Sequence, residues 1–198
     1  MENKIYETPQ SELSEIEKSE GTEFYVVSIK KFTILFMATF GIYAVYWFYR
    51  NWRQYKNKNG DNIWPVARGM FSIFFAHSLF ERIDGSLEKR SLVYKWYPSS
   101  YASFYVIIVI AGRIVDKLSD KSIGSPYTDV ISILTIPIVC YILAKVQGAI
   151  NLSQDDMNGS SNSNFTLPNY LWCAPGAILW FLVFLGLFNI FGLINLDS

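Results

Sequence analysis

The chain has 198 residues, of which 51% are hydrophobic, 17% are aromatic and 17% are charged, and its net charge at pH 7 is zero. Soluble domains carry about 25% charged residues, so this composition favours a membrane protein over a soluble globular domain. A nucleic-acid surface would need a strong basic excess, so nucleic acid is excluded as the expected partner.

Residues 1–23 are polar and rich in glutamate. A cleavable signal peptide needs a basic start followed directly by an apolar segment, and this stretch does not have that pattern. We expect a solvated acidic tail over residues 1–23 and one helical membrane domain over residues 24–198. The first apolar segment then acts as its own uncleaved insertion signal.

The first apolar segment, residues 32–49, contains no charged residue and continues into a basic stretch that ends near Lys58. At about 1.5 Å per residue, a helix of this length covers roughly 27 Å, which is close to a bilayer core. Tyrosine and tryptophan collect at its end beside Arg50 and Arg53, as they do where a helix leaves lipid. We predict one long helix here, ending at the turn signal that begins with Gly60.

Four more apolar segments follow, at residues 65–80, 101–115, 129–144 and 170–193. The 65–80 segment is short and contains Arg68 and His77, so it is either a span or a half-buried interfacial helix. The predicted fold class is therefore all-α: a polytopic helical membrane protein with about five transmembrane helices, or about four if the 65–80 segment is interfacial.

We expect a charged loop over residues 81–100 and a flexible loop over residues 151–164, which is rich in Ser, Asn, Asp and Gly. With five spans, lysine and arginine divide equally between the two sets of loops, so the positive-inside rule gives no orientation. We place the N-terminus in the cytoplasm, because a tail without a signal is easiest to leave there.

Four side chains on the first helix share one face at helical spacing: Tyr43, Tyr46, Arg50 and Arg53. Arginine offers a planar fork to an anion and tyrosine adds hydroxyl groups, so this face is a candidate contact for a lipid headgroup or a partner protein. The structural alternative is ordinary interfacial anchoring by aromatic and cationic side chains.

A second candidate is a polar site within the membrane, formed by Arg68, His77, Glu81 and Arg113. His77 and Glu81 lie one turn apart, which suits a proton relay or a cation site near the surface. The alternative is that His77, the sole histidine, bonds a neighbouring backbone or side chain. We expect no metal site, since one histidine and nearby acids fall short of converging ligands.

Three polar or thiol features have structural interpretations. Gln147 and Asn151 are one turn apart, and such amides often bond between helices. Arg113 and Asp116 either pair, or Asp116 caps the polar turn that follows. Cys140 and Cys173 both lie in apolar segments and are expected to be inert buried thiols.

Residues of the first two segments resemble a group of small bacterial inner-membrane proteins of unassigned function. The shared pattern is a Thr-x-Gly-Ile-Tyr-x-x-Tyr-Trp-x-Tyr helix, here Thr39 to Tyr49, followed by Pro65-x-x-Arg68. The later Gln147-x-x-x-Asn151 is also similar, and the first motif is similar to that of the DUF4234 membrane domains. The resemblance implies a multi-pass protein of the bacterial inner membrane and implies no activity or cofactor.

No catalytic or nucleotide-binding motif is present, so an enzyme assignment has no residue to rest on. We expect a non-enzymatic integral membrane component that contacts lipid headgroups, another membrane protein or a second copy of itself. The alternative is a small transporter or channel subunit for ions or small solutes. A third hypothesis is a lipid-modifying enzyme that uses His77 with an acid.

Overall fold

The computed structural model describes residues 21–191, which form α-helices and one 3₁₀ helix, with no strand in this range. The all-α prediction is therefore confirmed for this part of the chain. In chain order the helices are α2 (Ile29–Ala38), α3 (Tyr43–Asn59), α4 (Pro65–Met70), α5 (Ser72–Lys89), α6 (Pro98–Ser119), α7 (Tyr127–Ser153), η1 (Ser160–Asn162) and α8 (Leu167–Ile190).

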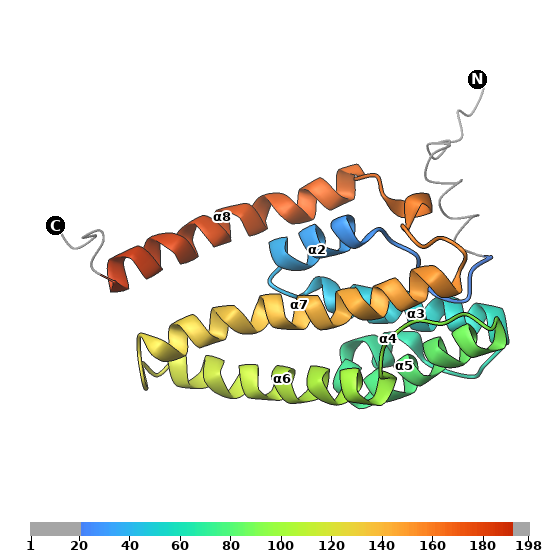
Figure 1. The fold of residues 1–198 in the computed structure, drawn as a ribbon. Helices are drawn as coiled ribbons and strands as arrows, with labels where there is room; N and C mark the ends of the chain where they lie inside the picture. The colour runs from blue at the N-terminus through green and yellow to red at the C-terminus, as the bar shows by residue number, and fades with distance from the viewer. Residues whose placement is uncertain (1–20, 192–198) are drawn as a thin grey trace, which may run out of the picture.

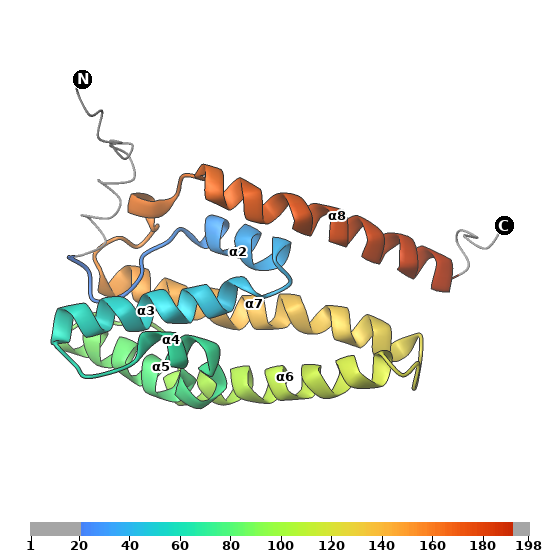
Figure 2. The ribbon, with the colours of Figure 1, turned by 180° about the vertical axis from the view of Figure 1, so that it is seen from behind.

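Helices α6 and α7 form a long antiparallel hairpin that runs the length of the molecule (Figure 1). Helices α2 to α5 gather along one half of this hairpin, and α8 lies over α2 on the other side (Figure 2). We call the end that holds the α3–α4, α5–α6 and α7–α8 loops the base, and the end with the α6–α7 turn the far end. The far end is narrower because the short helices do not reach it.

The predicted single helix over residues 32–58 is wrong, because the chain reverses at residues 39–42 between α2 and α3. Phe40 and Gly41 both adopt positive φ, at 52° and 82°, which ends α2. The Thr39 hydroxyl joins the two helices: it donates to the carbonyl of Leu35 and accepts from the backbone N–H of Tyr43 at 3.0 Å. Hydropathy alone does not reveal this turn, since its residues are as apolar as the helices.

A second reversal divides the 65–80 segment at Phe71, between α4 and α5. Pro65 begins α4 at the position where its missing N–H costs nothing. The predicted charged loop over residues 81–100 is wrong in its first half, because α5 continues to Lys89. The α2–α3 and α4–α5 pairs are thus two helical hairpins whose turns lie beside the middle of α6 and α7 (Figure 1).

Helices α7 and α8 are long and apolar enough to cross a membrane, by length and composition. They correspond to the fourth and fifth predicted segments, and α7 includes Pro137 without interruption and continues to Ser153. Helix α6 covers the third predicted segment. The predicted continuation of the last span to residue 193, like the predicted tail over residues 1–20, lies outside the described residues.

The core at the base is closed by an extended segment, residues 24–28, whose side chains are buried. Gln147 donates to the carbonyl of Tyr25 and to the Asn151 side chain, and Asn151 donates to the carbonyl of Val27. The prediction that these two amides share a face and bond structurally is confirmed. They satisfy backbone groups that would otherwise be unpaired in an apolar core.

The loop after α7 is packed against the same segment, contrary to the expected flexible loop. Asn162 donates to the carbonyl of Val26, and its own carbonyl accepts from the N–H of Ser28. The buried Lys31 ammonium donates to the Asn162 side chain and to the carbonyl of Asn164, each at 2.6 Å. This loop therefore anchors the start of α8 beside α2.

Candidate functional site

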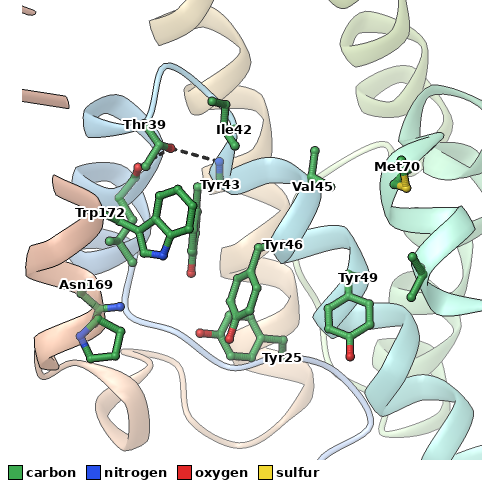
Figure 3. Close-up of a pocket in the computed structure, with 13 residues that line it drawn as sticks. Tyr25, Thr39, Ile42, Tyr43, Val45, Tyr46, Tyr49, Met70, Asn169 and Trp172 are labelled. Carbon is green, nitrogen blue, oxygen red and sulfur yellow. Dashed lines mark hydrogen bonds between the residues drawn. The ribbon is translucent and has the colours of Figure 1, made fainter. Parts of the chain in front are cut away.

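A groove of about 540 Å³ lies between α3 and the first turns of α8 (Figure 3). Tyr43, Tyr46 and Tyr49 line it from α3, while Asn169 and Trp172 line it from α8. Its size falls within the range of small-molecule sites, about 300–1,000 Å³. We call it the tyrosine groove.

Local sequence explains how α3 supplies one wall of the tyrosine groove. Tyrosines spaced three residues apart along a helix project toward the same side. The opposite face of α3 carries Trp47, Phe48 and Trp52, which are fully buried in the core. This division fixes the rotation of α3 and leaves its tyrosine face toward α8.

The other wall depends on a close crossing of α8 over the end of α2. A Cβ on Gly176 would lie 1.7 Å from the carbonyl oxygen of Ala38, so only glycine allows this approach. One turn later, the Trp180 indole donates to the carbonyl of Met37 at 2.7 Å and stacks on Phe40 with ring centroids 4.6 Å apart. These contacts hold α8 on α2, and the groove remains open alongside.

The tyrosine groove has an apolar part and a polar part. Leu35, Ile42 and Val45 line it near the turn of the α2–α3 hairpin. Hydroxyl groups follow toward the base, because Tyr46 and Tyr49 come one and two turns later on α3. A ligand with an apolar tail and a polar head would match this lining, with its tail near the hairpin turn and its head toward the base.

Arg50 lies over the polar part of the groove. Its guanidinium carbon is 4.9 Å from the centre of the Tyr25 ring and 5.9 Å from that of Tyr46, and its Nη1 donates to the Tyr46 hydroxyl at 3.3 Å. Arg53, one turn further, is exposed and donates to the Tyr49 hydroxyl at 3.2 Å. The predicted set Tyr43, Tyr46, Arg50 and Arg53 therefore surrounds one groove and its rim.

Tyr25 completes the polar part from the extended segment before α2. Burial, reinforced by the nearby Tyr46, raises the pKa of Tyr25 to about 12. Its hydroxyl accepts from the Asn162 side chain at 3.0 Å, which ties the groove to the packed loop. Tyr25 is neutral at physiological pH, as an ordinary tyrosine is, and it adds no negative charge beside Arg50.

The second predicted site is spread over several helices: His77 and Glu81 are one turn apart on α5, whereas Arg113 is on α6 and Arg68 on α4. His77 bonds the Ser103 hydroxyl at 3.1 Å, in agreement with the structural interpretation. Arg113 is ten residues beyond Ser103 on α6, or about 15 Å along the helix axis. Glu81 is exposed on α5. Asp116 accepts from the Ser132 hydroxyl, so the expected pairing with Arg113 or capping of the turn is replaced by an α6–α7 contact.

Arg68 has a neighbour that the sequence pattern did not indicate. Its guanidinium carbon is 4.3 Å from the centre of the Trp52 ring, and that of Arg82 is 5.4 Å from the same ring. Cation–π contacts of this kind stabilise a cation at the edge of an apolar core. We assign Arg68 to the packing of α4 and α5 on α3.

The spacing of residues on α3 does not indicate the groove residues from other segments, among them Tyr25, Asn169 and Trp172. Trp172 lies within the predicted 170–193 segment, whereas Tyr25 and Asn169 lie outside every predicted apolar segment. No spacing rule connects them to α3, because they are brought there by the crossing of α8 and α2. The aromatic character of both segments was the only available signal.

Within residues 21–191, no group of three or more His, Cys, Asp or Glu side chains is arranged to hold a metal ion. Cys140 is buried, as expected, while Cys173 is half-buried. No protein-family model, no curated protein and no solved structure matches the chain. The resemblance carried by the Thr39–Tyr49 motif therefore stays a prediction.

Proposed function

We propose that this protein is a non-enzymatic integral membrane component that holds an amphiphile with an anionic head in the tyrosine groove. The observation that carries this proposal is the polarity of the groove, apolar at the hairpin turn and hydroxyl-rich at the base, with Arg50 over its polar part. Arginine and tyrosine together suit a phosphate or carboxylate headgroup.

Exposed apolar surface supports a membrane location. Helix α8 exposes large side chains around much of its circumference, and α6 exposes Phe104, Ile107, Ile110 and Ile114. A contiguous apolar surface of this extent is uncommon on a soluble monomer. With α7 and α8 long and apolar enough to span, this surface supports three crossing helices, α6, α7 and α8.

The two short hairpins support a topology different from five full spans. Helix α2 has ten residues, about 15 Å, which is half the depth of a hydrocarbon core of about 30 Å. Its partner α3 returns to the base, and α4–α5 does the same. We propose that both hairpins enter the bilayer from the base side and return to the same side. Such re-entrant segments are tolerated in a membrane where neighbouring helices cover their backbone.

This topology removes the ambiguity in orientation. Among the described residues, the far end carries three cations, Arg113, Lys117 and Lys121. The remaining lysines and arginines of residues 21–191 belong to the base half, on and between α2–α5, in the loop before α6 and in the second half of α7. By the positive-inside rule the base faces the cytoplasm. A bacterial inner membrane is proposed on the resemblance alone.

The test is lipid retention by the purified protein. Arg50→Gln should lower the amount of phosphatidylglycerol that co-purifies from vesicles of phosphatidylglycerol and phosphatidylethanolamine in mild detergent, measured by mass spectrometry. Trp172→Ala, which removes the opposite wall, should do the same. Lys58→Gln removes an exposed cation from the same helix and is the matched control. Equal retention by Arg50→Gln and Lys58→Gln would contradict the proposal.

A further inference from the structure

A second cavity, of about 860 Å³, lies beyond the turns of the two short hairpins, between them and the α6–α7 pair. Phe40 and Phe71, one at each turn, line it on the base side, and Ile108 and Ile136 line it on α6 and α7. The hairpins end half-way along α6 and α7, so this cavity occupies space beside the other half of those helices. We call it the far cavity.

The tyrosine groove and the far cavity share three lining residues: Ile42, Val45 and Met70. All three lie at or next to the hairpin turns, Ile42 and Val45 at the start of α3 and Met70 at the end of α4. Ile42 and Met70 are each 65% exposed, so their side chains have room to move. The two spaces therefore meet along one apolar ridge at the middle of the molecule.

Polar side chains continue on the far side of this ridge. The Ser72 and Tyr105 hydroxyls bond each other at 2.7 Å, and both residues line the far cavity. Thr135 follows on α7, and its hydroxyl donates to the carbonyl of Ser132. The cavity ends at Arg113, Asp116 and Lys117, where Asp116 is bonded by Ser132 and the sum of charges is positive.

We propose that the tyrosine groove and the far cavity together form a path along which an anionic phospholipid moves its headgroup between the two leaflets. The proposal rests on the membrane location and ligand class proposed above. A cationic group marks each end, Arg50 at the base and Arg113 at the far end, and hydroxyl groups line the space between them on both sides of the ridge.

The physical reason for such a path is the cost of a bare headgroup in hydrocarbon. A polar group without a hydrogen-bond partner is strongly unfavourable there, so side-chain hydroxyls that replace water lower the barrier. The ridge of Ile42, Val45 and Met70 interrupts the hydroxyl groups along the path with apolar side chains. Its width controls the rate at which a headgroup passes between the two spaces. The acyl chains remain in the surrounding lipid, since both spaces are partly open.

The experiment measures lipid exchange in vesicles of phosphatidylglycerol and phosphatidylethanolamine that contain the full chain and a tail-labelled fluorescent phosphatidylglycerol. A membrane-impermeant reductant bleaches the label in the outer leaflet. We expect further bleaching of inner-leaflet label with the native protein, above the rate of protein-free vesicles. Ile42→Trp should reduce this excess toward zero by filling the ridge, whereas Met70→Ala should increase it by widening the ridge.

Ile107→Trp is the matched control, because Ile107 is 59% exposed on α6 and lines neither space. Native rates for this variant with a reduced rate for Ile42→Trp would support the path. No excess bleaching by the native protein would overturn it, and so would equal exchange in Ile42→Trp and Ile107→Trp. Lipid retention that still depends on Arg50 would show that the groove binds lipid even where exchange fails.

Discussion

The indole nitrogen of Trp47 donates a hydrogen bond of 2.5 Å to the side-chain oxygen of Gln147, which is 100 residues away in the sequence. Both side chains are fully buried. The amide nitrogen of Gln147 in turn serves the carbonyl of Tyr25 and the side chain of Asn151. One amide thus joins α3, α7 and the segment before α2, which are the three parts that support the tyrosine groove.

Replacing Gln147 with leucine should strongly destabilise the fold. The change removes the bonds that Gln147 makes to the Trp47 N–H, the Tyr25 carbonyl and the Asn151 side-chain oxygen, at about 1–3 kcal/mol per buried group. Thermal unfolding in detergent is the measurement. Gln154→Leu is the comparison, because Gln154 is only half-buried and its loss should cost less. Equal effects would contradict a central role for Gln147.

Gly159→Ala should also destabilise the protein. Gly159 has φ of +63°, and an added Cβ would lie 2.4 Å from the carbonyl carbon of Val27, so the loop must move away. Strain and overpacking of this kind cost about 1–3 kcal/mol each. The control is Gly85→Ala, where nothing lies within 4 Å and a helical alanine is favoured by up to about 1 kcal/mol. Denaturant midpoints of the two variants should therefore shift in opposite directions.

Gly176→Leu should separate α8 from α2, because the side chain cannot fit against the carbonyl of Ala38. The measurement is cross-linking by a short bifunctional thiol-reactive reagent. The two cysteines are introduced as Phe40→Cys and Trp180→Cys, in a chain with Cys140 and Cys173 replaced by serine. We expect the yield to fall sharply. Gly186→Leu changes the same helix where nothing lies within 4 Å, so it should leave the yield unchanged. A high yield in Gly176→Leu would disprove the crossing.

Acid below pH 3.8 should loosen the loop that precedes α8. Partial burial raises the pKa of Asp156, but the backbone N–H groups of Ser161 and Ser160 donate to the carboxylate, and the net pKa is below its ordinary value of 3.8. A carboxyl whose pKa is lowered by folding stabilises the folded protein above pH 3.8. This stabilisation is lost as the pH falls through the lower pKa of the folded state. The effect is small, because the carboxyl is largely exposed.

Thermal unfolding followed from neutral to acidic pH checks this expectation. Asp156→Asn should be less stable than the native chain near neutrality, and the difference should shrink at low pH. A difference that grows with acidity would show that the sign is wrong.

Cysteine labelling from one side of the membrane checks the topology. Asn62→Cys, Val93→Cys and Met157→Cys lie in the three base loops and should all react from the cytoplasmic side, whereas Lys121→Cys in the α6–α7 turn should react from the other side. Five full spans would place Asn62 opposite Val93. Labelling of these two positions from opposite sides would therefore restore the five-span arrangement and exclude the re-entrant hairpins.

Sequence reasoning succeeded where a signal is local. Amide spacing correctly indicated a structural role for Gln147 and Asn151, and Gln147 on α7 indeed bonds Trp47 on α3. It failed at residues 39–42 and at Phe71, where the chain reverses within apolar segments and no charged residue marks the turn. Hydropathy measures the preference of a segment for lipid, and a re-entrant hairpin has the same preference as a span.

The tyrosine groove shows the same difference between residues with a local sequence signal and residues placed by long-range contacts. Tyr43, Tyr46, Arg50 and Arg53 were recognised because helical spacing alone places them on one side of α3. Asn169 and Trp172 were not, because their position depends on the missing side chain at Gly176, which lets α8 cross α2 at close range.

The sequence by itself determined that the chain is helical and apolar, and that one helix face combines tyrosine with arginine. These properties follow from composition and from periodicity within single segments. The tertiary structure decided that the first two apolar segments fold back as short hairpins, and that α8 closes a groove over the tyrosine face. Both depend on contacts between distant residues, such as Trp47 with Gln147 and Gly176 with Ala38, which no local pattern encodes.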